Sequence, residues 1–181
     1  MNECAGLLDV VVFATSGTLT VAQEIISVLM RDLPGADPEL VAEETLALVS
    51  VATARAVERG CAPRDAGRLS TAIVDIPLTL RDYLVGGALL EGDDARVDAD
   101  EAVYARLKRK TEFYDSHLPL HELPIEKVLG EKAALWMGRL SPPRLPEMPD
   151  VRLERLGLVA KLTTHLRLVF EMARQQSTAE N

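Results

Sequence analysis

The sequence predicts an all-α protein: a single-domain helical bundle of about six or seven helices that spans residues 1–181. Three observations predict this class. Aromatic residues make up only 4% of the chain and apolar residues 48%, a balance that favours helices packed through aliphatic side chains over a β-sandwich. Proline, glycine and capping residues divide the chain into segments of helical length. The last segment carries an apolar stripe that repeats every three or four residues.

The first predicted helix begins at Thr20. Thr20 and Gln23 have the spacing of a capping box, and apolar residues follow at helical intervals until Pro34 ends the segment. The preceding segment, residues 7–14, is compatible with either a helix or a strand. Gly17 is expected to supply the turn between these two segments.

Prolines mark the next boundaries. Asp37 and Pro38 are an N-cap and a first-turn proline, which predict a helix over residues 39–60. Pro63 starts the helix after it. Pro77 is expected to kink or break the apolar region that follows, because proline lacks the backbone N–H and clashes with the preceding turn.

The second half of the chain is predicted to contain three helices and one connector. An N-cap box precedes a helix from about residue 99 to 117, and another helix is expected over about 124–140. Residues 141–150, SPPRLPEMPD, hold four prolines in ten residues and are predicted to form an extended connector. The last helix covers about 151–175.

Charge and cysteine content limit the compartment and the partners. The net charge of -8 predicts no nucleic-acid partner and no anionic membrane surface, because both bind basic faces. Cys4 and Cys61 lie in no CxxC spacing, so a reduced cytoplasm is expected. No basic residue precedes the first apolar run, as a secretory signal requires, and three charges interrupt the apolar region 69–90.

The segment VVFATSGTLT, residues 11–20, resembles the first motif of haloacid-dehalogenase-type phosphatases. That motif is an apolar strand followed by Asp-x-Asp-Gly-Thr-Leu, and Gly17, Thr18 and Leu19 match its Gly-Thr-Leu. Ala14 and Ser16 occupy the positions of the nucleophilic and the acid/base aspartates. Because alanine cannot attack phosphorus or hold magnesium, the covalent mechanism is unavailable, and no activity is carried over.

A second function that this segment could have, without catalysis, is that of an anion-binding turn. The backbone N–H groups of Gly17, Thr18 and Thr20 would precede a helix N-terminus and could hold an anion through the helix dipole. In the alternative interpretation, Thr20 caps the helix with its own hydroxyl and Gly17 only forms the turn.

His117, His121 and Glu122, in the segment HLPLHELP, are a possible metal site. A loop that brought the two imidazoles and the carboxylate together would suit zinc. Pro119 interrupts the helix that would align the histidines, so the alternative is the end of one helix and the start of the next. No cofactor is expected.

Four polar residues lie in the most apolar region of the chain. We expect them to form either a structural ion pair beside Pro77 or the lining of a polar ligand pocket. These residues are Asp75, Arg81, Asp82 and Tyr83. The basic run RLKRK, residues 106–110, is predicted to be a solvated helix face. His165 is a lone histidine on the last helix.

The last helix carries apolar residues beyond a single stripe, which predicts a second surface that meets another copy of the chain. The predicted interface residues are Leu156, Leu158, Leu162, Leu166, Leu168 and Val169.

Two functions follow from these patterns. The first is a soluble interaction or accessory protein that acts through its surfaces, as a homo-oligomer or with a protein partner. The second is a helical enzyme or small-molecule-binding protein with a polar pocket near residues 75–83 or 114–122. No nucleophile motif, P-loop or dinucleotide motif is present in the sequence, so the first function is the main prediction.

Overall fold

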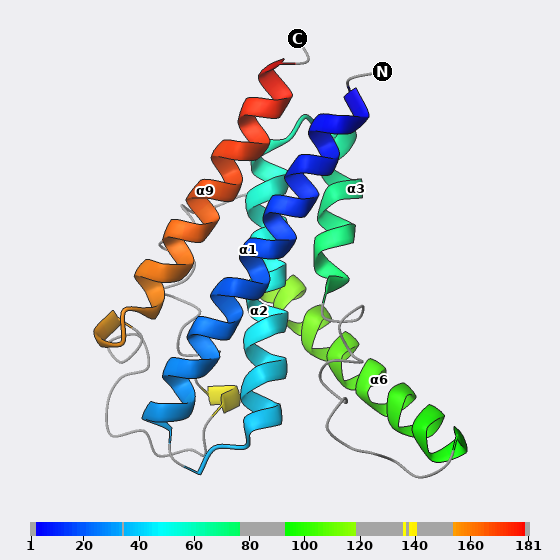
Figure 1. The fold of residues 1–181 in the computed structure, drawn as a ribbon, viewed down its shortest axis with the longest axis vertical. Coiled ribbons are helices and arrows are strands. Elements are labelled where there is room, and N and C mark those ends of the chain that lie inside the picture. The colour runs from blue at the N-terminus through cyan, green and yellow to red at the C-terminus, as the bar shows by residue number, and fades with distance from the viewer. Residues whose placement is uncertain are drawn as a thin grey trace.

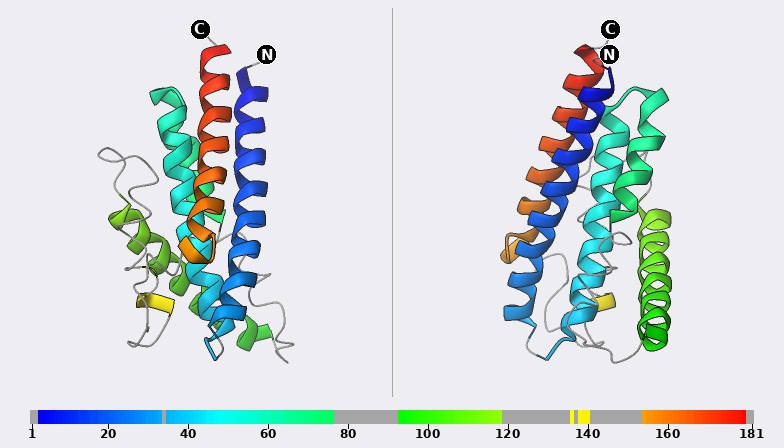
Figure 2. Two further views of the ribbon diagram at one scale, coloured as in Figure 1. Left: turned by 90° about the vertical axis from the view of Figure 1, so that its left-hand side faces the viewer. Right: turned by 45° about the vertical axis from the view of Figure 1, so that its right-hand side comes forward.

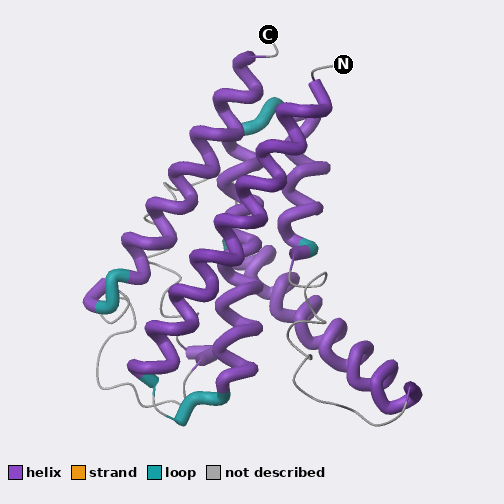
Figure 3. Tube along the Cα trace, viewed as in Figure 1, coloured by secondary structure: helices purple, strands orange, loops and turns teal. Residues whose placement is uncertain are grey.

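The computed structural model describes residues 3–33, 35–76, 93–118, 136, 138–140 and 154–179. All regular structure among these residues is helical, which confirms the predicted all-α class (Figure 3). The full helices are α1 (Glu3–Asp32), α2 (Pro38–Gly60), α3 (Pro63–Val74), α6 (Asp93–His117) and α9 (Leu158–Ala179). The predicted break at Pro77 and the connector 141–150 lie outside the described residues.

The helix α2 is the centre of the fold. It contacts α1, α3, α6 and α9, and α1 and α9 also run side by side along the long axis of the molecule (Figures 1 and 2). Both chain ends lie at the same end of this pair, so α1 and α9 are antiparallel. The helix α6 packs on α2 only near its C-terminal half and extends away from the bundle.

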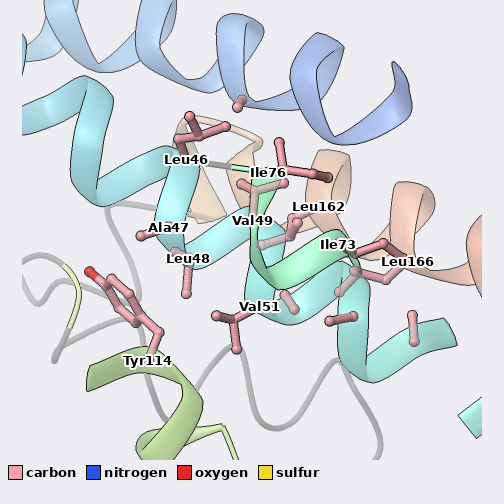
Figure 4. Close-up of a cluster of buried hydrophobic side chains, with 14 of the residues drawn as sticks. Leu46, Ala47, Leu48, Val49, Val51, Ile73, Ile76, Tyr114, Leu162 and Leu166 are labelled. Atoms are coloured by element: carbon pink, nitrogen blue, oxygen red, sulfur yellow. The ribbon is translucent and has the colours of Figure 1, made fainter. Parts of the chain in front are cut away.

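The local signals for α2 act as predicted. The Asp37 carboxylate accepts a hydrogen bond from the Glu39 N–H at 3.0 Å, Pro38 lies in the first turn, and the helix ends at Gly60. Every residue from 43 to 54 is buried. A helix that is buried all round is the core of its protein, and Figure 4 shows its aliphatic side chains directed toward α3, α6 and α9.

The first helix differs from the prediction: α1 is continuous through residue 17. Residues 7–14 are therefore helical, and the turn predicted at Gly17 is wrong. Thr20 is no N-cap, because its hydroxyl donates to the Ser16 carbonyl of the preceding turn at 2.9 Å. Glycine inside a helix costs about 1 kcal/mol, and burial of one long stripe on α2 and α9 outweighs that cost. The stripe consists of Val10, Ala14, Thr18, Ala22, Ile25 and Leu29.

Gly17 of α1 allows α9 to approach closely, whereas the atom nearest to Gly6 is the end of the flexible Gln176 side chain. A Cβ atom at Gly17 would lie 2.7 Å from His165 Cε1, and one at Gly6 would lie 2.7 Å from Gln176 Oε1. The two contacts are eleven residues apart on each helix, which is three helical turns. Gly17 therefore marks a helix crossing and not a bend in the chain.

The helix α9 begins at Leu158, later than predicted, after Gly157 with a φ of 70°. Its apolar stripe belongs to the chain's own core. Leu158, Leu162, Leu166 and Val169 are at most 2% exposed, so they cannot meet another copy, and the interface predicted at these four residues is wrong. The other two predicted interface residues differ from them, because Leu156 is partly buried against the core and Leu168 is 55% exposed.

Two helix glycines should respond oppositely to alanine. A Cβ at Gly60 would lie 2.6 Å from the Phe170 carbonyl oxygen, whereas Gly67 has no such neighbour within 4 Å. We expect Gly60→Ala to lower the free energy of unfolding by about 1–2 kcal/mol, because α9 must shift. Gly67→Ala should raise it by up to about 1 kcal/mol through helix propensity. Urea denaturation of both variants measures this difference, and equal signs would contradict the close crossing of α2 and α9.

Candidate functional site

A buried charged cluster joins α2 to α6. The side chains of Glu43 and Glu44 are each 2% exposed. Arg106 donates to the Glu43 carboxylate at 2.7 and 3.0 Å, and Lys110 donates to it at 2.7 Å. A buried carboxylate is stable only when such partners replace water.

The neighbouring carboxylate of Glu44 shares Lys110, whose Nζ lies 3.4 Å from Glu44 Oε1, and has two further partners. The Tyr114 hydroxyl donates to it at 2.8 Å, and Arg139 donates at 2.7 and 3.0 Å. The Arg139 guanidinium also lies 4.0 Å from the centroid of the Phe113 ring, a cation–π contact. Figure 4 shows Tyr114 reaching from α6 toward α2 with its hydroxyl leading.

The electrostatics of this charged cluster favour a structural role, the docking of α6 on α2. Burial alone would raise the pKa of Glu43, but hydrogen bonds from Arg106 and Lys110 and their charges lower it overall. Burial and the charge of Glu44 raise the pKa of the Tyr114 phenol. The donors of α6 are directed at the carboxylates of α2, so the cluster docks one helix on the other.

The charged cluster also corrects the interpretation of the basic run 106–110. Lys108 and Arg109 are exposed as predicted, but Lys110 is buried and Arg106 is partly buried. Four residues separate Arg106 from Lys110, one turn of α6, so both face α2.

A second polar group links three helices inside the core. The Thr18 hydroxyl of α1 donates to Thr53 Oγ1 of α2 at 3.0 Å, and Thr53 Oγ1 lies 2.9 Å from His165 Nε2 of α9. A neutral ring in this position carries its proton on Nδ1 when Thr53 donates to Nε2, and on Nε2 when Thr53 accepts from it. Burial lowers the pKa of His165 to about 4, so the ring is neutral at neutral pH.

The seam between α1 and α9 contains a groove of about 600 Å³. At one end its walls are apolar and include Phe13 of α1 and Leu168 of α9. At the other end lie Gly157 and an ion pair in which Lys161 Nζ is 2.5 Å from Glu24 Oε2. We call this feature the seam groove.

The middle of the seam groove is polar. His165 lines it opposite Gly17, and the hydroxyl-bearing residues around them are Ser16, Thr20 and Thr164. The volume is within the range of small-molecule sites, about 300–1,000 Å³. The seam groove therefore combines apolar walls with a small number of hydrogen-bonding groups.

The predicted anion-binding turn is excluded by the fold. Gly17, Thr18 and Thr20 lie inside α1, where backbone N–H groups bond to carbonyls of the preceding turn. They lie far from the N-terminus of their own helix, because α1 begins at Glu3. Two of these residues instead line the seam groove, and Thr18 joins the hydrogen-bonded chain to His165.

The other predicted site residues are placed only in part. His117 ends α6, with Nδ1 2.6 Å from the Phe113 carbonyl oxygen, while His121 and Glu122 lie outside the described residues. Among the described residues, no group of three His, Cys, Asp or Glu side chains could hold a metal ion.

Asp75 caps the C-terminus of α3, and its backbone N–H donates to the Thr71 carbonyl at 3.0 Å. The rest of the predicted pocket, residues 81–83, lies outside the described residues. The residues that line the seam groove include no described residue of the two predicted locations, 75–83 and 114–122.

Sequence analysis missed the exposed apolar residues of α1. Leu8, Val12 and Phe13 are 62%, 56% and 40% exposed. Their signal was present: on a continuous helix they fall outside the stripe that begins at Val10 and Ala14. The assumed turn at Gly17 obscured that periodicity.

The apolar character of α1 has a second consequence. Its segment Gly6–Asp32 is long and apolar enough to cross a membrane. Only 28% of its most apolar stretch is buried, on the face that packs on α2, α3 and α9.

Comparison with known proteins gives no relative for this chain. No family model matches it, and no match is found among curated proteins or among solved structures.

Proposed function

We propose that this protein is an interaction protein that associates with a second copy of itself through the exposed face of α1 and α9. The observation that supports this proposal is the set of large apolar side chains left in water on that face: Leu8, Val12, Phe13 and Leu168. Phe13 and Leu168 line the same groove, so the set bridges both helices. Burial of such side chains is the main favourable term in association.

The dimensions of this face suit a dimer. The 22 residues of α9 span about 33 Å, and two adjacent helices are about 20 Å wide. The whole face therefore covers roughly 650 Å², close to the 800 Å² or so that each partner buries in a standard interface. Its apolar side chains lie at one end, around residues 8–13 and 168, and its remainder is polar. A two-fold axis would place the same apolar residues of both copies opposite each other.

A second copy is a better partner for this face than lipid. Beyond Phe13, the exposed face of α1 becomes polar, with Ser16, Gln23 and Arg31 exposed. A helix surrounded by lipid is apolar all round. The net charge of -8 also opposes an anionic membrane surface.

Substitution of one exposed residue tests the proposal. Val12→Glu should convert a dimer at micromolar concentration into a monomer of 19.8 kDa and leave the helical circular dichroism unchanged, because residue 12 faces solvent within its own chain. The matched control is Tyr104→Glu, at a 41% exposed residue on α6, which should remain dimeric. Analytical ultracentrifugation measures the mass of each protein.

Three outcomes would reject self-association at this face. The first is a wild-type monomer at high concentration, and the second is equal dissociation of the Val12 and Tyr104 variants. The third is a wild-type monomer that sediments with neutral phospholipid vesicles, which would make lipid the partner of α1.

A further inference from the structure

We infer that the seam groove binds an amphipathic monocarboxylate, a molecule with one carboxylate and an apolar chain of about eight carbons. The inference goes beyond self-association and does not depend on it, because one chain supplies every residue that lines the groove. It rests on three features: the order of side chains along the groove, the space at Gly17, and two donors, His165 in the middle of the groove and Lys161 beside Glu24 at the end away from Phe13.

The donors for a carboxylate are His165 and Lys161. They are four residues apart on α9, so they lie on the same face of the helix, and both line the groove. His165 is 6% exposed, and its Nε2 is engaged with Thr53. In the tautomer in which Thr53 donates to Nε2, the Nδ1–H is the donor that is left for a ligand. Hydrogen bonds between a carboxylate and a charged amine are stronger than neutral ones.

Because Gly17 has no side chain, the imidazole of His165 has room beside α1 at the groove. A Cβ atom at residue 17 would lie 2.9 Å from His165 Nδ1 and 2.7 Å from Cε1. Any other residue would press against the imidazole edge that carries the donor. The glycine thus explains why a small residue occurs in the middle of a long apolar helix, where it weakens the helix by about 1 kcal/mol.

Lys161 is able to exchange its partner. Its side chain is 43% exposed and that of Glu24, with which it pairs, is 49% exposed. Surface ion pairs of this kind contribute about 0–1 kcal/mol. Rotation of Lys161 from Glu24 toward a ligand carboxylate therefore costs little.

The apolar chain of the ligand would lie toward Phe13 and Leu168. These residues form the apolar end of the groove. The seven residues from Lys161 to Leu168 rise about 10 Å along α9, which matches the length of a chain of eight carbons. Each CH₂ group buried there contributes about 0.8 kcal/mol.

Binding of sodium octanoate tests the inference. Calorimetric titration of the wild-type protein should show one saturable site per chain, and the ¹⁵N resonance of His165 Nδ1 should shift on binding. Octylamine, with the same chain and the opposite charge, should not bind. Lys161→Met should weaken octanoate binding at least about tenfold, because it removes a charge-assisted hydrogen bond.

Two tryptophan variants separate the groove from other surfaces. Thr20→Trp places a large ring in the groove from an exposed helix position and should abolish binding. Ser27→Trp places the same ring two turns further along α1, at an exposed residue that does not line the groove, and should bind as the wild type does. Circular dichroism checks that both variants are folded.

The inference is overturned if octanoate does not bind, or if Thr20→Trp binds it as tightly as Ser27→Trp does. It is also overturned if octylamine or 1-octanol binds as tightly as octanoate, because the carboxylate would then have no role. The two proposals share Phe13 and Leu168, so a second copy on this face would cover the apolar end of the groove. Titration of octanoate into Val12→Glu separates them, because residue 12 does not line the groove. Octanoate binding by this variant supports the groove site whatever the mass of the wild type, and no binding overturns it.

Discussion

Replacement of Glu44 with leucine should lower the free energy of unfolding by about 3–5 kcal/mol. The change removes the acceptor of two hydrogen bonds from Arg139 and one from Tyr114. The Tyr114 hydroxyl, on a side chain that is 2% exposed, would then be buried without a partner, which is costly. Urea denaturation followed by circular dichroism measures the loss.

The control for this variant is Glu39→Gln in the same helix. Glu39 pairs with Arg106 at 2.7 Å, but its side chain is 54% exposed. A surface pair contributes about 0–1 kcal/mol, so the control should be nearly as stable as the wild type. If the Glu44 and Glu39 variants lost equal stability, burial would not be the source of the strength of the charged cluster.

A decrease in pH from 7 to 5 should lower the free energy of unfolding by about 2 kcal/mol through His165 alone. Burial lowers its pKa in the folded protein to about 4, from an ordinary value of 6.5. The unfolded chain therefore binds a proton near pH 6.5, whereas the folded chain does not. The stability contributed by the neutral ring is complete above pH 6.5 and is lost as the pH falls toward 4.

The difference between the wild type and His165→Phe isolates this effect. Phenylalanine cannot titrate. Between pH 7 and pH 5, the free energy of unfolding of the His165→Phe variant should therefore change by about 2 kcal/mol less than that of the wild type. Measurements at pH 5 and above avoid the titration of Glu43, whose pKa is below its usual 4.5. Parallel pH profiles for the two proteins would show that His165 is accessible to protons in the folded state.

The buried polar groups explain why the two largest effects lie away from the exposed face. Glu44 and His165 connect α2 to α6 and to α9 respectively. Each would be unfavourable in the core without its partner. The small aliphatic side chains of α2 would allow the neighbouring helices to pack in several positions along its axis. The polar pairs select one of these positions.

The sequence by itself determined the helical class and the bounds of α2. Its signals there are local: the Asp37 side chain caps the first turn, Pro38 is compatible with that turn, and the chain leaves the helix after Gly60. Such signals act within a few residues and need no knowledge of the rest of the molecule. The aliphatic composition acts similarly, because it excludes most β architectures before any contact is known.

Tertiary structure alone decided what Gly17 does. In isolation, a glycine between two apolar segments is equally compatible with a turn and with a helix crossing. The contact with His165, more than 140 residues away in the chain, makes residue 17 part of a helix because α9 needs the space. The propensity cost of about 1 kcal/mol is smaller than the burial gained along α1.

Tertiary structure also decided which apolar and charged residues of the helices are buried. Periodicity identified the stripe of α9, but a stripe of this kind packs equally well in its own bundle or against a second copy. Its burial by α1 and α2 assigns it to the core and leaves Leu168 outside. In the same way, only the position of α2 beside α6 turns Lys110 from a solvated lysine into a buried partner of Glu43, because the free energy of a charge depends on its neighbours in space.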